Sequence, residues 1–212
     1  MIRIEKMIFN TFQVNTYLLW DETAECIVID PACYEEHEKK ALENFLLKNK
    51  LTLVRNLNTH CHIDHVLGND FIAQTYHIYP EYHKNAVPFF YTLKELASSF
   101  GYTVEQIPKP ARFIEDNEIV RWGNSSLKVF FTPGHAEGSV CFYQEQQGFV
   151  ITGDVLFKDT VGRTDMPTGD FDQLMNSIKT RLFTLPEQTI VYPGHGPETS
   201  IGYEMNNNPF IR

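Results

Sequence analysis

The chain has 212 residues, of which 42% are hydrophobic and 21% charged, a composition typical of a globular protein that buries roughly 70% of its unfolded surface. Its formal net charge of −9 argues against nucleic acid as a partner, because phosphate binding depends on clusters of Lys and Arg. We therefore expect one domain over residues 1–212, which needs no metal or disulfide simply to fold, and a small molecule as its partner.

The sequence gives no sign of export or membrane insertion. Charges interrupt any signal-peptide core in residues 1–6, and no apolar run approaches the roughly 18 residues of a membrane span. The cysteines lack C-x-x-C spacing, which predicts free, mostly buried thiols in a reducing cytoplasm. These cysteines are Cys26, Cys33, Cys61 and Cys141. Cys61 lies between candidate metal ligands, but an extended backbone would point it away from them, so we predict a packing role.

Strand-like patterns open the chain and a helical pattern follows. Runs of β-branched and aromatic residues predict strands at residues 2–9, 16–20 and 26–29. Residues 35–49 then change to a helical period, which predicts an amphipathic helix. Its expected polar face is Glu38, Lys39 and Lys40, and its expected apolar face is Ala41, Leu42, Phe45 and Leu46.

The middle of the chain is less regular. Residues 53–57 predict another strand, and a second helix is expected from Asp64 to about Thr75. Residues 80–110 are rich in aromatic side chains and contain four prolines, which favours a helical or looped excursion over a sheet. This excursion either covers the core or helps to form a substrate pocket.

The last part of the chain returns to strands. They are expected at residues 118–121, 126–131, 139–143, 149–152 and 190–192. Between the last two, Asp170 begins a helix, because Asp-x-x-Gln is a capping pattern. The apolar residues that follow at helical spacing are Phe171, Leu174, Met175, Ile178 and Leu182. This order of elements favours two packed sheets with helices outside them.

Seven residues form a candidate metal site. Imidazole and carboxylate groups bind zinc, iron or manganese, and H-x-H-x-D-H concentrates four of them in six residues. The candidate ligands are His60, His62, Asp64, His65, His135, Asp154 and His195. Each follows a predicted strand, so loops at one sheet edge can bring them together. Since the chain needs no metal to fold, a catalytic metal is favoured. His37, His77 and His83 belong to no such motif and are predicted to be bystanders.

Three motifs carry a family resemblance. They are Thr-His-x-His-x-Asp-His at residues 59–65, Thr-Pro-Gly-His-Ala-Glu-Gly-Ser at 132–139, and Gly-Asp-Val-Leu-Phe at 153–157. In this order the chain resembles the metallo-β-lactamase superfamily and, within it, the glyoxalase II-like hydrolases. Gly-Arg-Thr-Asp at 162–165 is similar to the short, single-domain members. The resemblance implies an α/β (α+β) fold, a four-layer αβ/βα sandwich with a dinuclear metal site at one edge.

The resemblance also implies roles for the seven candidates. By position, one metal is bound by His60, His62 and His135, the second by Asp64, His65 and His195, and both by the bridging carboxylate of Asp154. Zinc is the first choice, with iron or manganese as alternatives. Two metals roughly 3.5–4 Å apart share a water and lower its pKa from about 15.7 to about 7, which makes a bridging hydroxide. Asp64 or a water then relays the proton, so Asp64 and Asp154 are the catalytic candidates.

The implied reaction is metal-dependent hydrolysis of a thioester or a related ester. The bridging Asp154 argues against a β-lactamase, and the negative charge argues against the nuclease branches. Glyoxalase II enzymes with a C-terminal helical region use its basic residues to bind glutathione. Here Arg212 is the only cation after His195, so we expect weak dependence on the glutathione moiety.

Three questions stay open at this point. Persulfide dioxygenases resemble the chain in the same motifs but use a single iron, although Met-Pro-Thr-Gly at 166–169 is more similar to the short hydrolases. Arg163 either forms a structural ion pair with Asp165 or binds a substrate carboxylate. Tyr17 either contacts the substrate, because the first hairpin is expected near the metal site together with Asn15, or packs in the core.

Overall fold

The computed structural model describes residues 1–211, so Arg212, discussed above as a cation, lies outside the described residues. The first sheet has the strand order β1-β2-β3-β4-β5-β6. The strands are β1 (Arg3–Phe9), β2 (Val14–Trp20), β3 (Glu25–Ile29), β4 (Thr52–Leu57), β5 (Pro80–His83) and β6 (Arg112–Ile114). The first two pairings are antiparallel and the other three are parallel.

The second sheet has the order β14-β13-β10-β9-β8-β7, in which only β10 and β13 pair in parallel within the described residues. Its strands are β7 (Ile119–Trp122), β8 (Ser125–Phe131), β9 (Val140–Gln144), β10 (Phe149–Gly153), β13 (Ile190–Pro193) and β14 (Thr199–Ser200). A separate small hairpin joins β11 (Leu156–Phe157) to β12 (Thr160–Val161).

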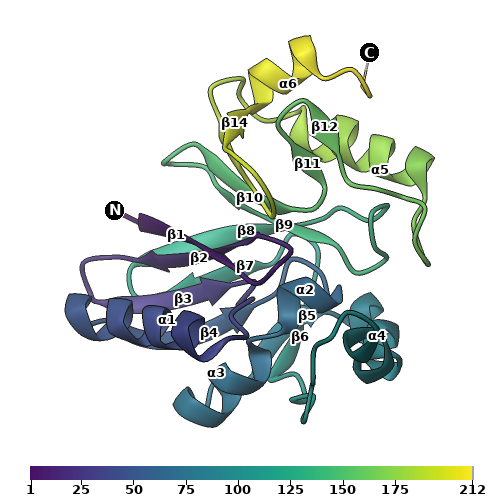
Figure 1. The fold of residues 1–212 in the computed structure, drawn as a ribbon. Coiled ribbons are helices and arrows are strands. Elements are labelled where there is room, and N and C mark those ends of the chain that lie inside the picture. The colour runs from purple at the N-terminus through teal and green to yellow at the C-terminus, as the bar shows by residue number, and fades with distance from the viewer. Residues whose placement is uncertain (212) are drawn as a thin grey trace.

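Helices flank both sheets (Figure 1). They are α1 (Glu36–Asn49), α2 (Ile63–Val66), α3 (Asn69–Tyr76), a 3-10 helix (Lys84–Tyr91), α4 (Leu93–Ser99), α5 (Phe171–Ser177) with a π-helical extension (Ile178–Leu182), and α6 (Ile201–Asn207). None of the helices in the described part of the chain is long and apolar enough to cross a membrane.

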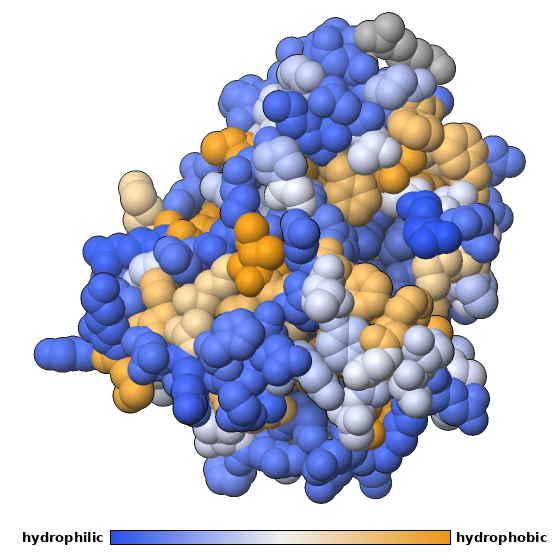
Figure 2. Space-filling view, in the orientation of Figure 1, coloured by the Kyte–Doolittle hydropathy of each residue, from blue (hydrophilic) through white to orange (hydrophobic). Residues whose placement is uncertain are grey.

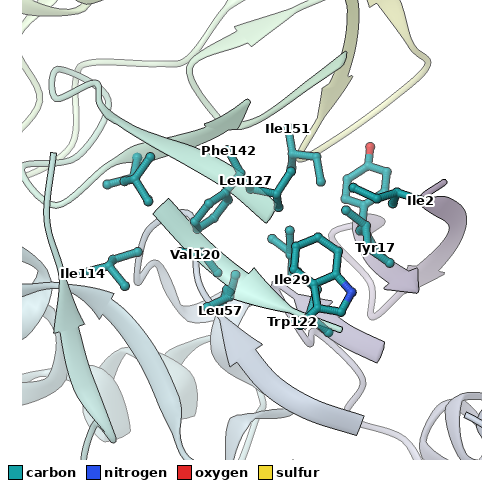
Figure 3. Packing of buried hydrophobic residues seen from close by; sticks show 14 of the residues in the cluster. Ile2, Tyr17, Ile29, Leu57, Ile114, Val120, Trp122, Leu127, Phe142 and Ile151 are labelled. Atoms are coloured by element: carbon teal, nitrogen blue, oxygen red, sulfur yellow. The ribbon is translucent and has the colours of Figure 1, made fainter. Parts of the chain in front are cut away.

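The core lies between the two sheets. Ile29 and Leu57 from the first sheet pack with Leu127 and Phe142 from the second, and all four are buried (Figure 3). A second apolar cluster holds α1 and α3 against the first sheet, and a third holds α5 against the second sheet. Two inward faces and two helical covers make the four-layer sandwich that the sequence predicts.

The register of α1 differs from the expectation. Glu38, placed on the polar face, is 9% exposed, whereas Ala41, placed on the apolar face, is exposed. The carboxylate of Glu38 accepts hydrogen bonds from the backbone N–H groups of Asn10, Tyr34 and Glu35 at 2.6–3.0 Å. The sequence pattern could not show this, because the partners come from other segments.

Three other expectations need correction. The single helix over residues 64–75 is two helices, α2 and α3, separated at Gly68. The Gly68 N–H donates to Pro31 O at 2.8 Å, and an added Cβ would lie only 2.7 Å from the same oxygen. Residues 80–110 do contain helices, but they begin with strand β5, whose pairing with β4 and β6 depends on distant partners. Phe171, expected on the buried face of α5, is 45% exposed.

Asp21 links the turn after β2 to the turn before β8, and its loss is expected to destabilise the fold. Its carboxylate accepts from Thr23 N–H and Oγ1, Asn124 N–H and Ser125 Oγ at 2.6–2.9 Å. Burial alone would raise the pKa of Asp21, but the hydrogen bonds from Ser125, Thr23 and Asn124 lower it to about 2.

We therefore expect Asp21→Asn to lower the free energy of unfolding by about 2 kcal/mol at pH 7. Because the folded-state pKa is depressed, the contribution of Asp21 is present above its ordinary value of 3.8 and is lost as the pH falls toward 2. Urea unfolding at pH 7 and pH 3 measures both effects. Equal stability of the variant and the wild type at pH 7 would show that these hydrogen bonds contribute nothing net.

Candidate metal centre

The seven candidate ligands lie in segments that follow strands at one edge of the two sheets, and Asp64 and His65 lie in the short helix α2. His60 follows β4, and His65 lies in α2 three residues after His62. In the second sheet His135 follows β8, while Asp154 and His195 follow the parallel strands β10 and β13. The Gly194 N–H donates to Gly153 O at 2.8 Å, which holds the last two loops side by side.

A first group of ligand atoms comes from His60, His62 and His135. One ring nitrogen from each lies within 4.8 Å of the other two. The Nε2 atoms of all three are buried and have no hydrogen-bond partner among the described residues. A buried polar atom without a partner is costly, so three that converge on one point fit a cation that replaces the missing donors.

A second group comes from Asp64, His65 and His195, whose ligand atoms also lie within 4.8 Å of one another. His195 Nε2 is 3.3 Å from Asp64 Oδ2 and 3.2 Å from His65 Nε2. Asp154 lies between the two groups. Its Oδ1 is 3.4 Å from His65 Nε2, and its Oδ2 is 3.5 Å from His195 Nε2 and 3.7 Å from His135 Nε2.

Outer contacts fix the orientation of four imidazole rings. The Nδ1 partners are Thr59 Oγ1 for His60 at 3.1 Å, Asp30 Oδ2 for His65 at 3.0 Å, Arg163 O for His135 at 2.8 Å, and Phe12 O for His195 at 3.0 Å. Each acceptor receives a hydrogen bond from the Nδ1–H group. The proton therefore stays on Nδ1, and the Nε2 lone pair is directed into the cluster. Metal-binding histidines in proteins are held in this way.

Asp30 is a site residue that the sequence analysis missed. It is 1% exposed and accepts from Thr59 N–H at 2.7 Å, Thr59 Oγ1 at 2.6 Å and His65 Nδ1 at 3.0 Å. The available signal was its position, because Asp30 directly follows the apolar strand β3 as Asp154 follows β10. It carries no histidine motif, and therefore the ligand pattern did not include it.

The electrostatic field differs across the cluster. Burial, with the neighbouring His65, holds the pKa of His60 well below its ordinary value, which favours the neutral imidazole that a metal site requires. Burial would also lower the pKa of His195, but the carboxylates of Asp154 and Asp64 outweigh it and raise the pKa to about 9. The same carboxylates raise the pKa of His65 against its burial. The carboxylate side of the cluster therefore favours positive charge, whether protons or metal ions supply it.

A glycine allows the close approach at the centre. A Cβ on Gly194 would overlap Asp154 Oδ1 and lie 2.8 Å from His65 Cε1. The motif Pro-Gly-His at residues 193–195 thus places His195 beside the carboxylate without a side chain in between.

A cavity of about 570 Å³ opens over the cluster. The candidate ligands that line it include His62, Asp64 and His195. The rest of its lining is Phe12, Ile63, Leu96, Phe100, Phe157, Lys158, Val161, Arg163, Met166, Gly196 and Pro197, with the other ligands His135 and Asp154. In Figure 2 the surface is hollowed between the part over α5 and β12 and the part over α4, with hydrophobic side chains along the border.

Tyr17, offered above as a substrate contact, is a core residue. It is 1% exposed, packs in the cluster between the sheets (Figure 3), and donates from its hydroxyl to Pro193 O at 2.7 Å. It does not line the cavity. Asn15 donates from Nδ2 to Pro193 O and Gly196 O, both at 2.9 Å. These two residues hold the loop of His195, which is why the first hairpin lies near the site.

Arg163 fits both interpretations given to it. Its guanidinium forms two hydrogen bonds of 2.7 Å with the carboxylate of Asp165, and both side chains are more than 60% exposed. It also lines the cavity, and its backbone carbonyl holds His135. Because the guanidinium already has an anionic partner in Asp165, the argument for Arg163 as the main anion site is weaker.

The remaining histidines and cysteines lie outside the cluster. His37 is exposed, His77 ends α3 in the left-handed conformation, and the His83 ring stacks on Phe131 at 4.2 Å. The four cysteines are free and buried, as expected. Cys61 packs in an apolar cluster that includes Tyr82, which confirms its packing role.

Comparisons with known proteins agree with this geometry. Residues 9–195 match the sequence profile of the family described as metallo-beta-lactamase superfamily. A probable metallo-hydrolase of Bacillus subtilis, YqgX, is 34% identical over 97% of this chain and 96% of its own length. The hydroxyacylglutathione hydrolase GloC of Haemophilus influenzae is 33% identical over 99% of this chain and 98% of its own.

Solved structures are similar over the same range. The B3 metallo-beta-lactamase BLEG-1 has a TM-score of 0.88 with 31% identity and covers 99% of both chains. TTHA1623 in a di-iron-bound form has a TM-score of 0.86 with 32% identity, over 97% of this chain and 99% of that one. ETHE1 from Myxococcus xanthus has a TM-score of 0.79 with 28% identity, over 98% of this chain and 83% of that one. The chain belongs to the metallo-beta-lactamase superfamily.

Proposed function

We propose that the protein is a two-metal hydrolase of thioesters or related esters. Membership of the superfamily and the His/Asp cluster imply divalent metals, and the proposal adds their number, two, and zinc as the first choice. The observation that carries it is the pair of ligand groups with Asp154 between them, since a single metal needs only three or four ligands. Residues 1–212 act in this proposal as one domain.

The proposed reaction adds water to a thioester carbonyl. A carbon–oxygen bond forms, the carbon–sulfur bond breaks, and the products are a carboxylic acid and a thiol. When bound, divalent metals polarise the carbonyl and make a nucleophile available from water at neutral pH. The leaving thiolate requires little protonation, because thiols are acidic enough to ionise near pH 8.5 and the anion can leave as such.

Residues of the chain carry the other parts of the mechanism. His60, His62 and His135 would hold one metal, and Asp64, His65 and His195 would hold the other. Asp154 would hold both, since its carboxylate oxygens lie 3.4–3.7 Å from ring nitrogens of both groups. Asp64 lines the cavity and is the proposed group that receives the proton of the attacking water and passes it to the leaving group. The apolar lining excludes bulk water around the reacting bond.

Metal content and a substrate panel test this proposal on one preparation purified without chelator. We expect close to two transition metals per chain and thioester hydrolysis that is lost with a chelator and restored by zinc. The panel contains a thioester, a lactone, a persulfide and a β-lactam, the last because a similar structure is a B3 metallo-beta-lactamase. One iron per chain with persulfide oxidation would support the single-iron dioxygenase alternative and overturn the hydrolase proposal.

Within the panel, S-lactoylglutathione is compared with a truncated thioester of the same acyl group. GloC is named as a hydroxyacylglutathione hydrolase, but we propose only weak dependence on the glutathione part. A kcat/KM preference for glutathione above about a hundredfold, about 2.7 kcal/mol, would contradict that part. The hydrolase proposal itself would stand on such a result.

A further inference from the structure

The cavity over the candidate metal centre combines an apolar wall with a cation, Lys158, that forms no ion pair among residues 1–211. We propose that its substrate has an apolar body and an anionic group remote from the reacting bond, and that Lys158 binds this anionic group. The inference rests on the proposed hydrolase function and adds the class of substrate and a specificity-determining residue.

The apolar wall comes from segments far apart in the sequence. Phe12, in the loop between β1 and β2, meets Phe100, after α4, with ring centroids 5.3 Å apart. Tyr102 fixes this contact, because its hydroxyl bonds to both the Thr11 N–H and Thr11 Oγ1. Phe100 remains 50% exposed, and with Leu96 and Phe12 it lines the cavity. Apolar surface left exposed beside a reaction centre is stabilised when a substrate covers it.

Lys158 and Arg163 are the Lys and Arg residues of the cavity lining. The Arg163 guanidinium is paired in two hydrogen bonds with Asp165. Among the described residues, Lys158 forms no ion pair with a carboxylate, and its Nζ lies 5.7 Å from the centroid of the Tyr203 ring. In a chain of net charge −9, an unpaired ammonium at the mouth of the site is the group that attracts an anion.

The backbone that carries Lys158 is held from behind by α6. Lys158 and Asp159 form the turn of the β11–β12 hairpin. The Asp159 N–H donates to Glu204 Oε2 at 3.1 Å, and the Tyr203 hydroxyl donates to Asp159 Oδ1 at 2.8 Å. Glu204 is fully buried. A turn held by a buried carboxylate keeps Lys158 at the cavity instead of letting it move freely in solvent.

The position of this hairpin relates it to the reacting bond. Phe157, which precedes Lys158, has its ring centroid 6.2 Å from that of His195. The apolar wall around α4 and the β11–β12 hairpin lie in different halves of the molecule in Figure 1, and both contribute to the same cavity. A substrate that reaches the metal cluster therefore contacts both, with its charged end directed to Lys158.

Two matched pairs of thioesters test the proposal. In the first pair, the hexanoyl thioester of 3-mercaptopropionate is compared with the hexanoyl thioester of 3-mercaptopropionamide, so the charge lies on the thiol part. In the second pair, the carboxylate or amide lies instead at the far end of the acyl chain. Within a pair only the charge differs. We expect Lys158→Met to lower the ratio of kcat/KM for the charged over the neutral substrate about tenfold in at least one pair. Lys158→Arg should keep most of this ratio.

Lys128→Met is the matched control. Lys128 Nζ also lies over an aromatic ring, 5.5 Å from the Phe130 centroid, but it does not line this cavity. The control should leave both ratios within twofold of the wild type. An unchanged ratio in Lys158→Met for both pairs, or an equal loss for the charged and neutral members, overturns the role of Lys158.

A binding measurement separates this proposal from the hydrolase proposal. Calorimetry with the corresponding non-hydrolysable thioethers, on metal-loaded protein, gives the same comparison without turnover. If the wild type hydrolyses no thioester but binds the charged thioether more tightly, and this preference depends on Lys158, only the hydrolase proposal fails. If hydrolysis occurs, but replacing Lys158 changes the preference for the charged compound neither in kcat/KM nor in binding, only the present inference fails.

Discussion

Replacing Asp154 with Ala is expected to lower kcat/KM for a thioester at least about a thousandfold, equivalent to ~4 kcal/mol of transition-state binding. The reason is its place between the two ligand groups, 3.4 Å from His65 Nε2 and 3.7 Å from His135 Nε2. Ala leaves no oxygen at that point, so both proposed metals lose a ligand together. Metal content and kcat/KM are measured on the same preparation, and the two should fall in parallel.

Two further variants give this prediction its controls. Asp154→Asn keeps the size and one oxygen, so we expect a smaller loss of metal than with Ala. His37→Gln changes an exposed histidine in the first turn of α1 and should leave metal content and turnover unchanged. Normal metal content in a folded Asp154→Ala protein would show that the bridge is not required.

The clustering of the candidate ligands was predictable because they lie in short motifs. H-x-H-x-D-H needs only local sequence to suggest a metal, and the strand before each motif explains why His135 and His195 arrive at the same edge. The four-layer sandwich followed from the order of strands and helices and from the resemblance of the motifs. These features depend on neighbours in the chain or on a pattern that repeats along it.

Other features depend on contacts that a sequence pattern does not contain. Tyr17 was expected near the site because it lies in the first hairpin, yet it packs in the core and its hydroxyl donates to Pro193 O from the other sheet. Glu38 has the character of a surface residue, but three backbone donors surround it. Nothing in the sequence around Lys158 marks it as a binding residue, and only the hairpin and α6 place it at the cavity. In each case the partner is remote in sequence.

The partners of Asp30 are also remote in sequence, so its role could not be predicted. Its replacement is expected to have the second large effect, on both metal binding and stability. Asp30→Ala should weaken metal binding about 10–100-fold, because the carboxylate that orients His65 is lost. It should also lower the free energy of unfolding of the metal-free protein by about 3 kcal/mol, since the buried donors of Thr59 lose their acceptor. Metal affinity is measured by competition with a chelator, and stability by urea unfolding without metal.

A loss of affinity could follow from general damage to the fold, and Thr16→Val distinguishes that case. Thr16 is also fully buried, and its Oγ1 donates to the backbone carbonyl of Asp30 at 2.6 Å and accepts from the Ala32 N–H at 3.1 Å. This variant therefore loosens the same segment but leaves the carboxylate of Asp30 on His65. We expect it to lower stability with little change in metal affinity. If Thr16→Val and Asp30→Ala weaken metal binding equally, Asp30 acts by supporting the fold and not by orienting His65.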